Sequence, residues 1–136
     1  WLGDTFVKGH IPEIKAMASS MVTAYPFLLA VAFFFASTLL YSQAATTQAL
    51  VPAVILALGI TPENTGSVYI IIASFAAVSA LFVLPTYPTL LGAVQMDDTG
   101  STRIGHLVFN HPFFIPGVLA IAISVALGFV VAPLML

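Results

Sequence analysis

The feature that most constrains this chain is a run of 47 residues, 16–62, that contains no charged side chain but has a polar segment at its centre. The apolar arm before that segment has 15 residues (26–40), and the arm after it has 10 (49–58). A spanning helix needs roughly 20 apolar residues to cross a bilayer core of ~30 Å. Neither arm is long enough, so we predict a re-entrant helical hairpin over 26–58 that turns at Ser42–Thr47. Because lipid cannot satisfy irregular backbone, polar backbone at that depth is expected to line a cavity or a binding site.

The composition predicts an all-α membrane protein. Hydrophobic residues make up 60% of the chain and charged residues 6%, and two further uncharged stretches, 64–96 and 104–136, have 33 residues each. The formal net charge is −2, and three basic side chains are too few for a nucleic-acid surface. The absence of cysteine excludes disulfides and thiolate chemistry. The chain begins at Trp1 with no signal-peptide pattern, so it is expected to be part of a longer protein.

We divide the chain into three parts. Residues 1–25 are predicted to form a loop and an amphipathic interfacial helix (12–23), and 26–58 the re-entrant hairpin. Residues 59–136 are predicted to begin with a turn at 59–66. A discontinuous transmembrane helix follows at 67–84 and 89–95. A loop at 96–105 then leads to a last transmembrane helix at 112–132. The break in the discontinuous helix follows from Pro85 and Pro88, which remove backbone donors and push the preceding residues out of the α region. Pro116 is expected to kink the last helix and Pro133 to end it.

The orientation of these segments depends on few charges. Arg103 favours a cytoplasmic loop by the positive-inside tendency, which puts Glu63 and the opening of the hairpin outside. Lys8 and Lys15 would then lie outside as well, which counts against this orientation.

The two polar breaks are the predicted binding site. Discontinuous helices present N-termini with free N–H groups and a positive dipole end, which hold anions in membrane transporters without a buried lysine. Single hydroxyl side chains in membrane helices often bond only to their own backbone, but six polar residues at two breaks favour a site. Tyr87 could equally contact the substrate or anchor the chain at an interface. The candidate substrate-binding residues are Ser42, Gln43, Thr46, Thr47, Thr86, Tyr87 and Thr89.

The remaining motifs do not indicate an enzyme or a metal site. The string Asp98-Thr99-Gly100-Ser101 matches that of aspartic proteases, but it lies in a loop between apolar helices rather than in a β lobe with a partner carboxylate. Asp97 and Asp98 are too few for a calcium loop. The three histidines, His10, His106 and His111, do not share a ligand spacing.

Three motifs resemble the C-terminal part of the bacterial anaerobic C4-dicarboxylate transporter (Dcu) family. They are YSQAATT (41–47), FVLPTYPT (82–89) and QMDDTGSTRIG (95–105), and the resemblance covers about residues 3–136. It implies exchange or uptake of fumarate, succinate, malate or aspartate by a multi-pass protein of the bacterial inner membrane. It also implies a longer chain with an elevator fold of the ion-transporter type, of which this chain is one inverted-repeat half.

The predicted partners are therefore a C4-dicarboxylate, membrane lipid and the N-terminal repeat of the same transporter, while homo-oligomerisation is left open. No cofactor is implied, and the coupling ion, H⁺ or Na⁺, is not decided. The alternative function is a non-transporting membrane subunit or anchor, whose polar residues serve only helix packing. Two non-helical breaks at similar depth favour the transporter, because an anchor does not need them.

Overall fold

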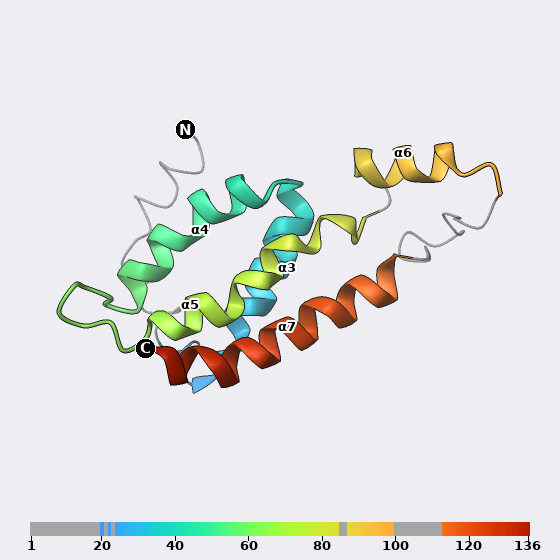
Figure 1. The fold of residues 1–136 in the computed structure, drawn as a ribbon. Helices are drawn as coiled ribbons and strands as arrows, with labels where there is room; N and C mark the ends of the chain where they lie inside the picture. The colour runs from blue at the N-terminus through green and yellow to red at the C-terminus, as the bar shows by residue number, and fades with distance from the viewer. Residues whose placement is uncertain (1–19, 21, 23, 85–86, 100–112) are drawn as a thin grey trace.

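The computed structural model describes residues 20, 22, 24–84, 87–99 and 113–136, and this part of the chain is helical. Its elements are α3 (Leu28–Leu40), α4 (Gln43–Ala57), α5 (Val68–Ser74), the 3-10 helix η1 (Phe75–Phe82), α6 (Pro88–Met96) and α7 (Phe114–Met135) (Figure 1). Outside these helices the described residues contain one isolated bridge, between Thr61 and Asn64. The predicted all-α class is confirmed for this part of the chain. The predicted helix at 12–23 lies almost wholly outside it, and residues 100–105 of the predicted loop lie outside it entirely.

Helix length separates α7 from the other helices. With 22 residues, α7 is the one described helix that is long and apolar enough to cross a bilayer. Helices α3 and α4 are also apolar, but they have 13 and 15 residues. At about 1.5 Å per residue each is roughly 20 Å long, which is shorter than a bilayer core of ~30 Å.

Helices α3 and α4 are joined by the short turn Tyr41–Ser42, so the prediction that the turn extends to Thr47 is wrong. Residues 43–47 instead form the first turns of α4. The polar residues fit a helix there because each satisfies a backbone group: Ser42 Oγ accepts from the N–H of Ala45 at 3.1 Å, and the Thr46 and Thr47 hydroxyls donate to carbonyls four residues back, both at 2.8 Å. The helix therefore starts six residues before the apolar arm at 49–58.

The interrupted helix has a more varied conformation than its sequence predicts. The segment predicted as one helix, 67–84, is an α-helix only to Ser74 and a 3-10 helix from Phe75 to Phe82, whereas α6 agrees with the predicted 89–95 within one residue at each end. Ala80 departs from helical geometry with a ψ of 29°. Pro85 lies outside the described residues.

Two hydroxyl groups of α3 bind the carbonyls of η1. The Ser37 hydroxyl donates to the Ala77 carbonyl at 3.2 Å, and the Thr38 hydroxyl donates to the Ala80 carbonyl at 3.1 Å. Each hydroxyl also shares its hydrogen with the Phe34 carbonyl of its own helix. Ser37 and Thr38 are buried, so these are hydrogen bonds between helices in an apolar interior.

Removing both hydroxyls is expected to weaken this contact. The double change Ser37→Ala with Thr38→Val should lower the stability of the full-length protein by roughly 1 kcal/mol, because interhelical hydrogen bonds in membranes average about 0.6 kcal/mol each. Thermal unfolding in detergent is the measurement. Thr47→Val is the matched control, since the Thr47 hydroxyl bonds only within α4. An unchanged melting temperature in the double variant would show that η1 is held by packing alone.

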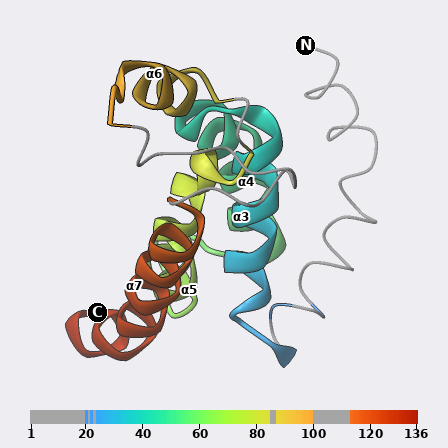
Figure 2. The ribbon, with the colours of Figure 1, turned by 90° about the vertical axis from the view of Figure 1, so that its right-hand side faces the viewer.

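Helix α7 lies alongside α5 and η1 and runs in the opposite direction (Figures 1 and 2). Its Gly128 lies against the backbone of Ala73, and its Gly117 lies against the ring of Phe82. The prediction that Pro133 ends this helix at 132 is wrong, since α7 continues to Met135. Proline removes one backbone bond but its fixed φ is compatible with a helix. Pro116 is the third residue of α7, where the missing N–H has no helical acceptor to lose.

The buried core lies where α3 packs against α5 and η1. Its fully buried residues include Phe33 of α3 and Val78 of η1, and partly buried residues of α7 pack against it. Large apolar side chains are exposed on the outer face of α7, among them Ile123 and Leu127. A water-soluble protein would bury such a face, whereas a bilayer accepts it.

Candidate functional site

The two polar breaks that the sequence predicts lie next to each other. The ring of Tyr41, in the turn between α3 and α4, is stacked on the ring of Tyr87, which precedes α6. The ring centroids are 6.2 Å apart and the planes differ by 2°. A second link joins the same region, because Gln43 Nε2 donates a hydrogen bond to Ser79 Oγ of η1 at 3.0 Å. The starts of α4 and α6 and the end of η1 are thus brought together.

The start of α4 is shaped to present N–H groups. Ser42 is its N-cap, in an extended conformation with φ −153° and ψ 121°. The Ser42 side chain accepts a hydrogen bond from the N–H of Ala45. The N–H of Thr46 already bonds to the Ser42 carbonyl. The N–H groups of Gln43 and Ala44 remain, and helix geometry gives them no acceptor within the helix. Both residues are exposed.

The start of α6 also has N–H groups without an acceptor within the helix. Tyr87 is its N-cap, with φ −66° and ψ 126°, and no side chain caps the helix. Pro88 occupies the first position and has no N–H to leave unpaired. The N–H groups of Thr89 and Leu90 follow, and they too have no acceptor within the helix. The Thr89 side chain is exposed beside them.

These two helix ends make the described part of the site electropositive. Each helix N-terminus carries a partial positive charge of about half an elementary charge, which favours anions. The described acidic residues lie elsewhere: Glu63 is in the loop before α5, and Asp97 and Asp98 follow the far end of α6. The Asp97 carboxylate accepts from the N–H of Thr99, a local turn bond. The arrangement suits an anion whose carboxylate can accept several N–H bonds.

The structure separates the candidate residues predicted from sequence into two groups. Ser42, Gln43, Tyr87 and Thr89 lie at or beside the two helix starts. Thr46 is fully buried, and its hydroxyl is committed to the Ser42 carbonyl.

Thr47 is partly exposed, but its hydroxyl hydrogen is committed to the Gln43 carbonyl. Both threonines can offer an anion no hydrogen without breaking those bonds. Thr86 lies outside the described residues.

Two residues of this region were not among the predicted candidates. Ser79 is a single serine in an otherwise apolar stretch, and Tyr41 directly precedes the predicted turn. The hydroxyl of Ser79 inside an apolar run was the available signal. Neither contact could be predicted from position alone, because each joins residues that are far apart in the chain.

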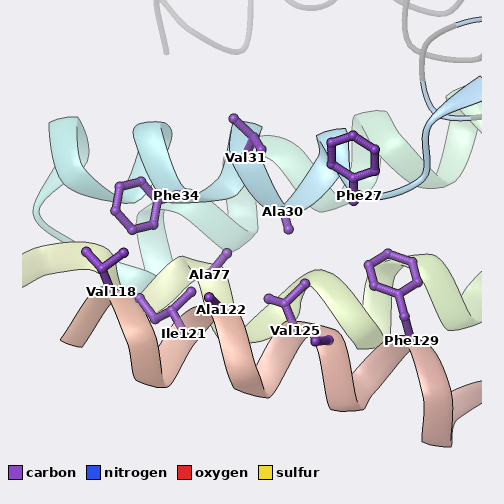
Figure 3. A pocket seen from close by; sticks show the side chains of 11 residues that line it. Phe27, Ala30, Val31, Phe34, Ala77, Val118, Ile121, Ala122, Val125 and Phe129 are labelled. Carbon is purple, nitrogen blue, oxygen red and sulfur yellow. The ribbon is translucent and has the colours of Figure 1, made fainter. Parts of the chain in front are cut away.

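A separate groove runs between α3 and α7 and is unsuited to a charged ligand. It has a volume of about 400 Å³ and is lined by apolar side chains only (Figure 3). They include Phe27, the N-cap of α3, Phe34 of α3, and Val125 and Phe129 of α7. A carboxylate placed there would lose its hydration without gaining a hydrogen bond, which is strongly unfavourable. The polar meeting point of α4, η1 and α6 is therefore the candidate anion site.

Known proteins similar to this chain are membrane transporters. The family model described as anaerobic C4-dicarboxylate membrane transporter matches residues 1–136. The C4-dicarboxylate transporter DcuA of Helicobacter pylori (strain ATCC 700392 / 26695) is 68% identical over 136 residues, which are 100% of this chain and 31% of that protein. DcuA of Escherichia coli (strain K12) is 60% identical over 100% of this chain and 30% of its own length. The anaerobic C4-dicarboxylate transporter DcuB of Escherichia coli O6:H1 is 37% identical over 97% of this chain and 28% of its own length.

No solved structure matches the chain. The chain spans 31% of the Helicobacter pylori relative, and the match extends over all of its own residues. Because the family model also covers every residue, the chain belongs to the anaerobic C4-dicarboxylate membrane transporter family.

Proposed function

We propose that the protein containing this chain moves C4-dicarboxylates such as fumarate, succinate, malate or aspartate across the bacterial inner membrane, by exchange or uptake. The observation that carries the proposal is the meeting of two helix N-termini, those of α4 and α6, whose side chains do not cap them fully. Membership of the transporter family supports it. The chain would contribute one half of the binding site.

One carboxylate of the substrate would be held between the two helix starts. Its oxygens would accept from the N–H groups of Gln43 and Ala44 on one side and of Thr89 on the other. One Nε2 hydrogen of the Gln43 side chain bonds to Ser79. Its second Nε2 hydrogen would donate to the same carboxylate. The Thr89 and Tyr87 hydroxyls add neutral donors.

We place the hairpin and the interrupted helix in the membrane in the manner of a transporter repeat. Helices α3 and α4 are each roughly 20 Å long, so a hairpin entering from one face would turn at Tyr41–Ser42 inside a core of ~30 Å. The start of α6 would lie at a similar depth, because Tyr87 stacks on Tyr41. The N-terminal repeat of an elevator fold would then supply the contacts to the second carboxylate.

The alternative, a membrane anchor, has one observation in its favour. The hydroxyls of Ser37, Thr38, Thr46 and Thr47 all bond to backbone carbonyls, as expected for residues that serve packing. These bonds do not account for the N–H groups of Gln43 and Ala44, which have no acceptor within α4. A membrane anchor does not need two neighbouring helix N-termini whose N–H groups lack acceptors.

Transport by the reconstituted full-length protein tests the proposal. Vesicles loaded with unlabelled fumarate should accumulate labelled succinate, and excess external malate should compete whereas excess acetate should not, because a monocarboxylate occupies only half of the site. Vesicles without protein are the control. A protein that is correctly inserted but takes up no labelled dicarboxylate under any internal loading would favour the anchor.

A further inference from the structure

Tyr41 has a backbone conformation that tyrosine rarely adopts. Its φ of 51° and ψ of 24° lie in the left-handed region, and among the described residues it is the one non-glycine residue with a positive φ. Glycine and asparagine are the usual residues at such a position after a helix. The backbone alone therefore gives no reason for an aromatic residue here, so the reason must lie in what the side chain contacts.

The ring of Tyr41 contacts the residue that begins α6. It is stacked on Tyr87 with a centroid distance of 6.2 Å. Helices α3, α4, α5, η1 and α7 pack against one another, but α6 does not pack extensively against any other described helix. Figure 1 shows α6 extending away from the rest of the helices. The stacked pair is thus a direct contact between the residue before α6 and the turn before α4.

We propose that Tyr41 is a positioning residue of the substrate site, which acts by holding Tyr87 so that the N-termini of α4 and α6 face the same carboxylate. This inference rests on the proposed transport function. The field of a helix end falls off within about one turn. An α6 that is free to move away from α4 would therefore leave the carboxylate with one helix end instead of two.

Three variants of the full-length protein test the role of the ring. Tyr41→Asn removes the ring but keeps a residue that favours the left-handed conformation, so the turn should still form. It is expected to raise the KM for succinate uptake about tenfold, the effect of losing roughly one favourable helix-end interaction, with a smaller change in maximal rate. Tyr41→Phe keeps the stacked ring, so it should raise the KM less than Tyr41→Asn does. The melting temperature of Tyr41→Asn should stay well above the temperature of the uptake assay, which separates the effect on KM from unfolding.

A double-variant cycle shows whether Tyr41 acts through Tyr87. In a Tyr87→Ala background, Tyr41→Asn should have no further effect on KM, because its partner ring is already gone. Additive effects of the two changes, a wild-type KM for Tyr41→Asn, or a Tyr41→Phe variant as impaired as Tyr41→Asn would each overturn the inference. If instead the wild-type protein takes up no succinate, it is the proposed transport function that fails.

Discussion

Ser42→Asp is expected to abolish dicarboxylate uptake by the full-length protein while leaving the hairpin folded. Aspartate caps helices as well as serine does, so α4 should still begin at the same residue. The added carboxylate would lie beside the position where the substrate's own carboxylate is expected. At a separation of ~5 Å and an effective dielectric constant of ~20, the repulsion is about 3 kcal/mol, or about a hundredfold in affinity.

Ser42→Asn is the matched control for this prediction. It has nearly the same shape as aspartate, is an equally good cap and carries no charge. It should retain most of the uptake, and both variants should reach the membrane in equal amounts with similar melting temperatures. Uptake of labelled succinate at neutral pH, compared between the two, isolates the charge. Equal uptake by both would mean that no substrate carboxylate binds at the start of α4.

Gly128→Ala is expected to destabilise the packing of α7 against α5. A Cβ atom at this position would lie 2.8 Å from the Ala73 Cα and 3.0 Å from the Ala73 carbonyl oxygen. These are backbone atoms, so the helices themselves must move apart to accommodate the methyl group. Overpacking of this kind typically costs about 1–3 kcal/mol, which exceeds the gain of about 1 kcal/mol from the higher helix propensity of alanine.

Gly92→Ala makes the same chemical change in the interior of α6, where a Cβ atom would meet nothing within 4 Å. This variant should keep or slightly raise the melting temperature of the detergent-solubilised full-length protein, and Gly128→Ala should lower it. Opposite signs for one substitution type would tie the effect to the contact with Ala73. A Gly128→Ala variant as stable as wild type would show that α7 does not approach α5 so closely.

The sequence predicted those helix boundaries that depend on local chemistry. Pro88 marks the start of α6, and Gly59, with a φ of 63°, follows the end of α4 as the turn composition predicted. The predicted start of α4 is wrong because polar residues can begin a helix as well as form a turn. The Ser42 and Thr46 side chains satisfy their own backbone, so a polar segment can be helical inside an apolar run.

The features that were not predicted depend on contacts between distant residues. The 3-10 conformation of η1 coincides with bonds from Ser37 and Thr38 to carbonyls 40 and 42 residues away. The same holds at the candidate site, where Ser79 joins Gln43 across 36 residues. Periodicity and composition describe one segment at a time, and they contain no information about which side chain of another segment a carbonyl will meet.

The 3-10 conformation of η1 also affects the length of the chain between α5 and the site. A 3-10 helix rises about 2.0 Å per residue and an α-helix about 1.5 Å. The eight residues of η1 are therefore roughly 4 Å longer than the same residues would be as an α-helix. The Ser37 and Thr38 hydroxyls of α3 donate hydrogen bonds to two carbonyls within this stretch. The length of η1 is thus linked to contacts with a neighbouring helix as well as to its own residues.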